Sequence, residues 1–263
     1  MQEFAKRAIN NLLKLLGVQL VRKQYVRTLD SFRSDHYIRH NQRRQEHLAS
    51  LNLNFTNKTV LEVGAGIGDH STFWIDRNCE VTITEAREES LKVLRTRFPG
   101  NKILQLDMDD VSKITSFNSF DIVYCYGLLY HLKNPADAIK FMSTHSQNML
   151  LLETCVSFGE DEKINNVDEN MDNPSQSSIG VGCRPTRVWV YNQLKKYFDF
   201  VYMPITQPAH SEFPLDWNKP APAIIETNTP LSRAVFIASK KELKHPLLVQ
   251  GIPSKQYISG SVI

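Results

Sequence analysis

Cysteine is scarce in this chain and never stands in a metal-binding or redox pattern. The four cysteines, Cys79, Cys125, Cys155 and Cys183, are far apart, without a C-x-x-C pair or companion histidines at metal-ligand spacing. We therefore expect free thiols, no metal site and a reducing, cytoplasmic compartment. A phosphate-binding G-x-x-x-x-G-K-[ST] motif and a Ser-His-Asp grouping are also missing, which disfavours P-loop nucleotidases and serine hydrolases.

A strong charge bias and a long apolar run are missing too. The 31 basic and 28 acidic residues leave a formal net charge of +3, which by itself does not indicate a nucleic-acid partner. The apolar stretch from Ala8 to Val21 is interrupted by Lys14 and falls short of the roughly 20 residues of a membrane span. We expect residues 1–50 to form a helical extension docked on the protein's own body, with contact to a membrane surface as the alternative.

Short β-rich runs alternate with helical stretches from Thr59 onward, which is typical of a parallel sheet with crossover helices. We expect strands at TVLEVG, EVTITE, KILQL, FDIVYCY and NMLLLET. Helices are expected near Gly68, at Arg87 and at Pro135, where Asn134 can cap the helix, and again at TRVWVYNQLKKYF. With later strands at FVYMP and RAVFIASK, the sequence predicts an α/β fold: a doubly wound, mostly parallel seven-stranded sheet that ends in an antiparallel hairpin.

Residues 51–243 are expected to form the main domain, with a lid inserted near residues 158–187. The lid segment is rich in Asn, Asp, Ser and Gly, too polar for a core and too long for a plain connection, so we interpret it as a functional loop. Residues 244–263 are expected to be a loosely held tail whose apolar residues between 247 and 252 can pack on the body.

The stretch VLEVGAGIGDH follows the first expected strand and contains three alternating glycines, Gly64, Gly66 and Gly68. Glycines at the turn after a strand let the backbone approach a ligand closely. The third glycine comes one residue early for a dinucleotide fingerprint, and Glu62 would repel a pyrophosphate on the adjacent turn. The pattern therefore favours a ligand with a cationic end and no phosphate.

Each of the next two expected strands also ends in an acid, Glu85 in TITEA and Asp107 in LDMDD. S-adenosylmethionine carries an ammonium and a sulfonium and no phosphate. At the carboxyl ends of parallel strands, Glu85 is placed to accept from the ribose hydroxyls and Asp107 from the adenine amino group. The three acids therefore suit three parts of one molecule.

In this order, LEVGAGIG, TITEA, LDMDD and DIVYCYGLLYHLKNP resemble the motifs of the class I S-adenosylmethionine-dependent methyltransferases. The resemblance covers Thr59 to about Thr154 and implies a Rossmann-like fold with S-adenosylmethionine as cofactor. The alternatives are a structural domain with a vestigial site and a nicotinamide enzyme with an unusual turn. The resemblance assigns Glu62, Gly64, Gly66 and Gly68 to the methionine moiety, Glu85 to the ribose, Asp107 and Met108 to the adenine, and Tyr126 to the sulfonium side.

Histidines supply the candidate bases, because methylation of an alcohol requires removal of a proton. His131 in GLLYHL directly follows the strand expected to face the methyl group, where it could act as the base or only position the acceptor. His210 in QPAHSEFPLDW is the second candidate, and His70 is expected to line the cofactor turn. His36 and His40 lie in RSDHYIRHNQRR, which could cover the cofactor or be a solvated helix face.

Three further residues are candidates for binding the acceptor. Tyr130 is expected to form a pocket wall. Arg184 and Arg187 flank the lid, where they could clamp a phosphate or carboxylate or simply form a solvated helix start. A small-molecule acceptor, with or without a negative charge, is thus the expected partner.

The sequence favours an enzyme that methylates a hydroxyl of a sugar, a glycan precursor or a secondary metabolite. A nucleic-acid modifier is the alternative, because GLLYHLKNP also resembles bacterial enzymes that alkylate a tRNA wobble uridine from a carboxylated S-adenosylmethionine. Neither a recognisable RNA-binding module nor a strong positive charge supports that alternative. A non-enzymatic binding domain is the third hypothesis, and the sequence carries no signal for an oligomeric state.

Overall fold

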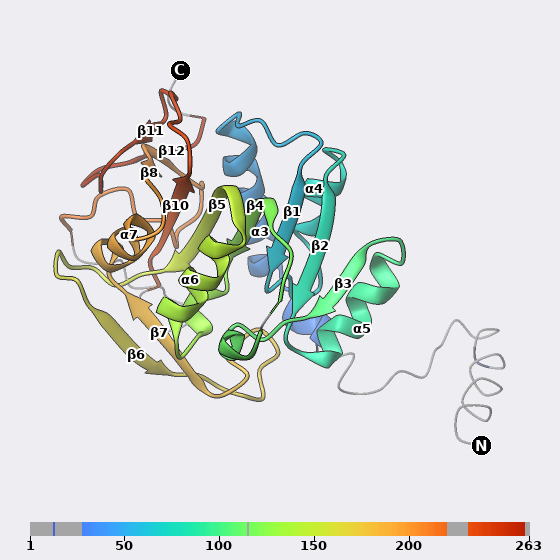
Figure 1. Cartoon of the computed structure of the whole chain (residues 1–263). Helices are drawn as coiled ribbons and strands as arrows, with labels where there is room; N and C mark the ends of the chain where they lie inside the picture. Colours follow the sequence, from blue (N-terminus) through green and yellow to red (C-terminus); the bar gives the residue numbers. More distant parts are fainter. Residues whose placement is uncertain (1–12, 14–27, 115, 220–230, 261–263) are drawn as a thin grey trace.

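The computed structural model describes residue 13 and residues 28–114, 116–219 and 231–260 (Figure 1). The helix expected at residues 8–21 lies, apart from one position, outside the described residues. The helices are α3 (Asp35–Ser50), α4 (Ser71–Ile75), α5 (Glu88–Arg97), α6 (Pro135–Thr144) and α7 (Arg187–Lys195), with 3₁₀ turns at Val111–Lys113 and Leu129–His131. The strands are β1 (Thr59–Val63), β2 (Glu80–Glu85), β3 (Lys102–Gln105), β4 (Phe120–Tyr126), β5 (Ser146–Cys155), β6 (Ile164–Asp168), β7 (Val181–Pro185), β8 (Phe200–Pro204), β9 (Thr206–Gln207), β10 (Arg233–Ser239), β11 (Leu248–Val249) and β12 (Tyr257–Ile258).

The central sheet has eight strands in the order β11-β8-β10-β5-β4-β1-β2-β3. Strands β1 to β5 run parallel, and β10 lies antiparallel between β5 and β8, which confirms the predicted closing hairpin. From β1 the chain adds β2 and then β3 on one side of β1, and it then crosses back to add β4 and β5 on the other side. The strand order therefore reverses between β1 and β4. A doubly wound sheet binds its ligands at the carboxyl ends of the strands beside such a reversal.

The eighth strand, β11, comes from the tail that the sequence analysis expected to be loosely held. Leu248 is buried against the sheet, and β11 pairs antiparallel with β8. Further along, the indole nitrogen of Trp217 donates to Gln256 Oε1 at 2.8 Å. The tail thus packs on the body through the apolar residues that the sequence offers for this, and β11 pairs with backbone groups of β8 that would otherwise lie at a sheet edge.

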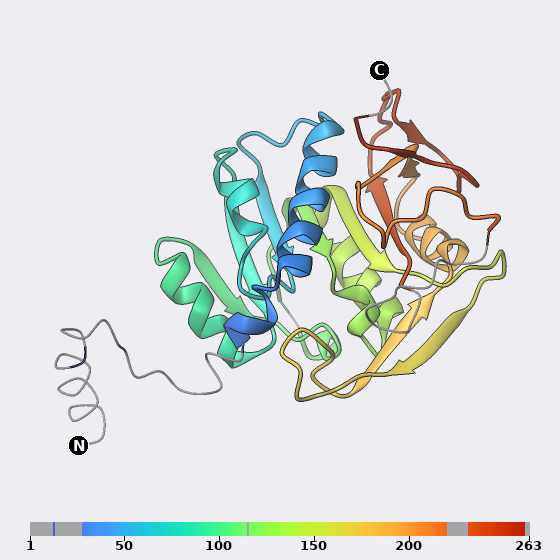
Figure 2. The same ribbon diagram turned by 180° about the vertical axis from the view of Figure 1, so that it is seen from behind.

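Alternation along the strands separates two apolar layers. In β1, Val60 packs with α3, α4 and α5 on one face, whereas Leu61 packs with α6 and α7 on the other. Strand β10 does the same with Val235 and Phe236. Figure 2 shows α3 and α4 on the first face, and Figure 1 shows α6 and α7 on the second. None of the helices in the described ranges is long and apolar enough to span a membrane.

Side-chain caps position the helices that carry candidate site residues. Ser34 precedes α3 and its hydroxyl accepts from the Tyr37 N–H at 3.2 Å, and Thr186 caps α7 in the same way. Asn134 occupies the cap position of α6 without a side-chain cap bond, contrary to expectation. Its N–H instead donates to Asp109 Oδ1 at 3.1 Å, so a carboxylate from the loop after β3 accepts a backbone hydrogen bond at the start of α6.

The predicted lid is a β-hairpin and not an irregular loop. Strands β6 and β7 pair antiparallel from Ile164–Pro185 to Asp168–Val181, and residues 169–180 connect them. Backbone pairing satisfies the polar groups of a segment whose side chains are mostly hydrophilic. The hairpin therefore holds its tip at a fixed place beside the carboxyl ends of β1 to β4.

We predict that Gly68→Ala destabilises the fold strongly. Gly68 has φ +83°, and an added Cβ would lie 2.4 Å from Phe98 and 2.7 Å from Leu94. Overpacking and left-handed backbone strain together cost roughly 2–4 kcal/mol in the free energy of unfolding. Urea denaturation measures this loss.

Gly100→Ala is the matched control, because an added Cβ at Gly100 meets no atom within 4 Å. Its free energy of unfolding should change by less than about 0.5 kcal/mol. Equal stability of the Gly68 and Gly100 variants would show that α5 does not constrain the glycine turn.

Candidate active site

A cavity of about 260 Å³ opens at the carboxyl ends of the parallel strands. Helix α3 and the lid tip form its walls, together with the turns after β1, β2, β3 and β4. Nine of the predicted site residues line it: Gly64, Gly66, Glu85, Asp107, Met108, Tyr126, Tyr130, His131 and Arg184. The structure thus brings together side chains that lie up to 120 positions apart in the sequence.

Glu62 and His70 lie next to this cavity, in a smaller one of about 30 Å³ that shares Gly64 and Tyr126 with it. The Glu62 carboxylate is 2% exposed and accepts from the Ser71 hydroxyl at 2.6 Å. Burial raises the pKa of Glu62 to about 8. A cationic ligand would hold this carboxyl in its ionised form, as expected for a group that meets an ammonium.

The glycine turn is fastened to the end of β2 through Glu85. Glu85 Oε2 accepts from the Gly66 N–H at 2.8 Å, and Oε1 accepts from the N–H groups of Ala86 and Arg87 at 2.9 and 3.0 Å. Burial raises the pKa of Glu85, and these N–H donors oppose the rise. A carboxylate between two loops at a cavity wall suits the two hydroxyls of a ribose.

Asp107 and Met108 form the wall after β3, where the adenine was expected. Asp107 Oδ1 accepts from the Asp109 N–H at 3.0 Å, and Met108 is buried in the core beneath it. Across the cavity, Arg87 donates to the backbone carbonyls of Gln176 and Ser177 at 3.1 and 3.0 Å. Arg87 therefore ties the lid tip to the strand end that carries Glu85.

Tyr126 ends β4 between the two cavities. Its ring stacks on Tyr124 with centroids 4.4 Å apart, and its buried hydroxyl has no hydrogen-bond partner among the described residues. Burial raises the pKa of Tyr126, so the hydroxyl stays protonated. Buried polar groups are normally bonded, so this hydroxyl indicates a site for a ligand atom.

His131 is held by a carboxylate from the lid. Its Nδ1 lies 2.5 Å from Glu169 Oε2, and Glu169 Oε1 accepts from Arg184 at 3.3 Å. Burial lowers the pKa of His131, while Glu169 opposes that change. With Nδ1–H donating to Glu169, the lone pair of the neutral ring is on Nε2. The arrangement fits a base whose orientation is fixed by an acid.

A buried ion network that the sequence did not indicate contributes Arg44, Glu212 and Arg233 to the cavity wall. Glu153 accepts from Arg44 at 2.9 Å and from Arg233 at 3.1 Å, and Arg233 also bonds Glu212. Arg233 Nη2 lies 3.1 Å from the hydroxyl of Tyr130. These residues come from α3, β5, β10 and the loop before β10, so no local motif marks them.

Three predicted site residues line neither cavity. Gly68 lies against α5, as described above, and therefore supports the turn by packing. Arg187 donates to the Pro253 carbonyl at 2.7 Å and stacks 3.8 Å over the ring of Trp217, so its guanidinium is used within the tail. His210 lies behind the wall, its ring centroid 4.9 Å from that of His40. Gly68 and Arg187 thus make packing contacts within the chain, and their expected roles in ligand binding stay predictions.

The match to known families agrees with this geometry. Residues 61–145 match the family model described as "Methyltransferase domain". A curated relative, a tRNA U34 carboxymethyltransferase from Pseudoalteromonas atlantica, is 28% identical over 129 residues. That match covers 47% of this chain and 38% of the relative.

Solved structures show the same fold. The N-terminal domain of EvdMO1, crystallised in the presence of SAH and D-fucose, superposes with a TM-score of 0.57 at 16% identity and covers 79% of this chain and 85% of that one. Magnesium protoporphyrin IX methyltransferase from Synechocystis PCC 6803, with bound SAH, gives a TM-score of 0.51 at 11% identity, with coverage of 90% and 100%. Residues 61–145 thus match a methyltransferase domain, and the described part of the chain has the fold of solved methyltransferases that carry SAH, which fits S-adenosylmethionine as the cofactor.

We predict that S-adenosylhomocysteine binding at pH 7 releases a proton from Glu62. The free carboxyl has a pKa of about 8, and a bound ammonium lowers it, so binding drives ionisation. Affinity should therefore fall by up to tenfold per pH unit as the pH drops below 8, until the lowered pKa is passed. Titration calorimetry in two buffers of different ionisation enthalpy at the same pH measures the proton count.

Glu62→Gln is the control, since it removes the titrating group and keeps an acceptor for Ser71. It should bind S-adenosylhomocysteine at least tenfold more weakly, or about 1.4 kcal/mol, without the proton attributed to Glu62. Identical apparent heats in both buffers for the unmodified protein would contradict an ammonium at this carboxyl.

Proposed function

We propose that the chain is an S-adenosylmethionine-dependent methyltransferase that acts on a hydroxyl group of a small-molecule acceptor, such as a sugar, a glycan precursor or a secondary metabolite. The observation that carries the proposal is the pair formed by His131 and Glu169 in the wall of the cavity. S-adenosylmethionine, when bound, supplies a methyl group on a sulfonium that is already a good leaving group. The protein must therefore hold the acceptor in line, exclude water and accept a proton.

His131 meets the requirements of the proton acceptor. It lies in the turn after β4 and lines the same cavity as Gly64 and Tyr126. Its lowered pKa keeps the ring neutral at pH 7, and Glu169 directs the free lone pair to Nε2 while stabilising the cation that forms. An alcohol needs such a group, whereas a neutral amine can attack before it loses its proton.

The walls around the cavity support a small acceptor. Helix α3 covers one side with Tyr37 and His40, and the lid tip covers another with residues 174–178. A cavity walled by α3 on one side and by the lid tip on another suits a small acceptor better than a folded nucleic acid. D-fucose in the crystals of the EvdMO1 domain supports a sugar as one candidate acceptor.

Tyr130 and Arg184, two of the residues expected to bind the acceptor, are both hydrogen-bonded within the chain. Tyr130 remains a wall residue, and its hydroxyl is held by Arg233. Arg184 lines the cavity, yet its donors bind Glu169 and the carbonyls of Tyr130 and Cys183. An anionic acceptor would therefore meet Arg233 and Arg184 only in competition with carboxylates already present.

A tRNA-modifying alkyl transfer is the second candidate function, supported by the 28% identity to the tRNA U34 carboxymethyltransferase. A carboxylate on the transferred group could accept from the Arg233 guanidinium, which lines the cavity beside the Tyr130 hydroxyl. Assays with S-adenosylmethionine and with its carboxylated form, each offered simple sugars or unmodified tRNA, separate the two functions. We also propose a reducing, cytoplasmic setting, because all four cysteines are buried free thiols.

We predict that His131→Ala lowers methyl transfer by roughly 10²–10⁴-fold, because a general base is lost. S-adenosylhomocysteine affinity should change less than threefold. The unmodified enzyme should lose activity as the pH falls through the His131 pKa, which lies below the ordinary value of 6.5. The measurement is single-turnover methyl transfer at saturating cofactor and acceptor between pH 5 and 9.

Glu169→Gln is the companion variant, since it keeps the shape of the side chain but removes the charge that orients His131. It should lose at least tenfold in rate with His131 still present. If His131→Ala retains the full rate and pH profile, the proton leaves by another route and the base assignment fails.

A further inference from the structure

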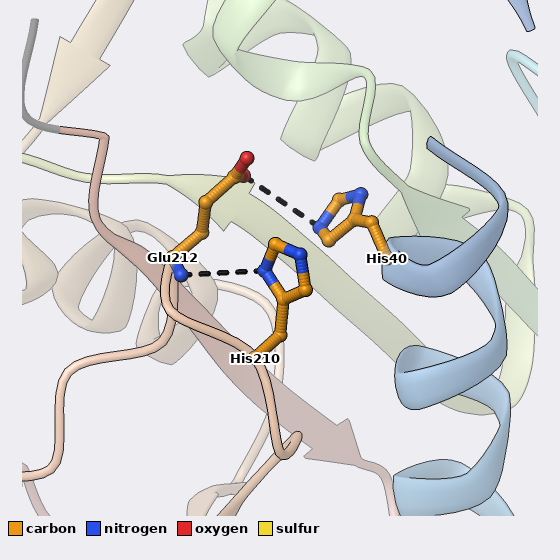
Figure 3. A group of neighbouring side chains, drawn as sticks. All are labelled: His40, His210 and Glu212. Carbon is orange, nitrogen blue, oxygen red and sulfur yellow. Dashed lines mark hydrogen bonds and ion pairs between the residues drawn. The ribbon is translucent and has the colours of Figure 1, made fainter. Parts of the chain in front are cut away.

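Two histidines and a carboxylate form one group of possible metal ligands at the proposed acceptor end of the cavity: His40, His210 and Glu212. His40 lies on α3, and His210 and Glu212 come from the loop before β10, about 170 residues later in the sequence. Their three donor atoms lie within 4.8 Å of one another (Figure 3). His40 and Glu212 line the cavity, and His210 closes the group from behind.

His40 has an unusual state for a buried ring nitrogen. The side chain is 5% exposed, yet its Nε2 makes no hydrogen bond within the described part of the chain. The nearest acid oxygen, Glu212 Oε2, is 3.7 Å away, which is too long for a hydrogen bond. Separations of roughly 3.4 Å are what two ligands of one tetrahedral zinc ion at about 2.1 Å adopt. The distance between His40 Nε2 and Glu212 Oε2 therefore suits two ligands of one metal ion better than a direct hydrogen bond.

His210 offers one imidazole nitrogen to the group. The Glu212 N–H donates to His210 Nδ1 at 3.3 Å, which is long for a hydrogen bond. A metal ion bound at Nδ1 would replace this long local bond and leave the proton of the neutral ring on Nε2.

The surroundings orient the carboxylate without excluding a cation. Arg233 donates to Glu212 Oε2, and His36 Nε2 lies 3.0 Å from Oε1. A carboxylate offers about four lone-pair sites, so these bonds leave room for a metal ion. The charge of Arg233 is shared with Glu153, and Glu153 also holds Arg44, so the two arginines are matched by two carboxylates.

We propose that His40, His210 and Glu212 form a binding site for one divalent transition-metal ion of the zinc type. Two imidazoles and one carboxylate are a common ligand set for such ions when one position stays open. Because His40 and Glu212 line the cavity, the open position would face the acceptor. On the function proposed above, a metal there would bind the acceptor oxygen and lower the pKa of its hydroxyl.

Metal titration of the full chain tests the site without any methyl transfer. Protein stripped with a chelator is titrated with Zn²⁺ by calorimetry, and separately with Co²⁺ while its visible absorption is recorded. We expect one Zn²⁺ per chain and a Co²⁺ spectrum of low coordination number. His40→Gln, His210→Gln and Glu212→Gln should each weaken Zn²⁺ binding at least tenfold and abolish the Co²⁺ band.

His245→Asn is the matched control, since His245 lies in the tail and its Nδ1 accepts a local N–H from Leu247 at 3.2 Å. Zn²⁺ binding should be unchanged in it. His210→Gln should keep S-adenosylhomocysteine affinity, which shows that the variant is folded. No Zn²⁺ binding by the unmodified chain, or equal binding by all three ligand variants, overturns the metal site. Because these readouts involve no acceptor, failure of the hydroxyl-methylation proposal leaves them unaffected.

Discussion

The buried pairing of Glu153 with Arg44 and Arg233 is the constraint on which the proposed acceptor end of the cavity depends. Glu153 is fully buried on β5, and an unpaired charge there would cost several kcal/mol. Its two partners come from α3 and from the first residue of β10. A helix that precedes the sheet and a strand near the end of the chain are thus fixed to the same carboxylate, and the cavity lies between them.

Much of the proposed cofactor end of the cavity could be predicted from the sequence because its signals are local. Glu62 and Glu85 lie within the last two residues of β1 and β2, and Gly66 and Asp107 follow β1 and β3 within three residues. The apolar pattern of each of these strands is visible in a few residues. Parallel strands bring such ends to one edge of a sheet, so position along the chain determines position in space. The hairpin of β8 and β10 was predictable for the same reason, whereas β11 needed the packing of a two-residue strand.

The acceptor end could not be predicted, since its contacts join residues far apart in the chain. Arg44 and Glu153 are 109 residues apart, and Arg233 and Tyr130 are 103 apart. Glu169 lies in a polar segment whose composition indicates a loop, and only pairing of β6 with β7 places it at His131. Two glycines of one motif also have different roles that the sequence does not distinguish. The Gly66 N–H donates to Glu85, whereas Gly68 packs against Leu94 of α5.

The two ends of the cavity differ in the partners of their carboxylates. At one end Glu62, Glu85 and Asp107 accept from hydroxyl and N–H groups, and none makes an ion pair with another described residue. At the other end Glu153, Glu169 and Glu212 are each paired with arginine. Unmatched carboxyls in a low-dielectric site attract a cation, while matched pairs do not. A cofactor with an ammonium would therefore gain by placing that group at Glu62, and the proposed function requires its methyl group to face the turn after β4 that carries Tyr130 and His131.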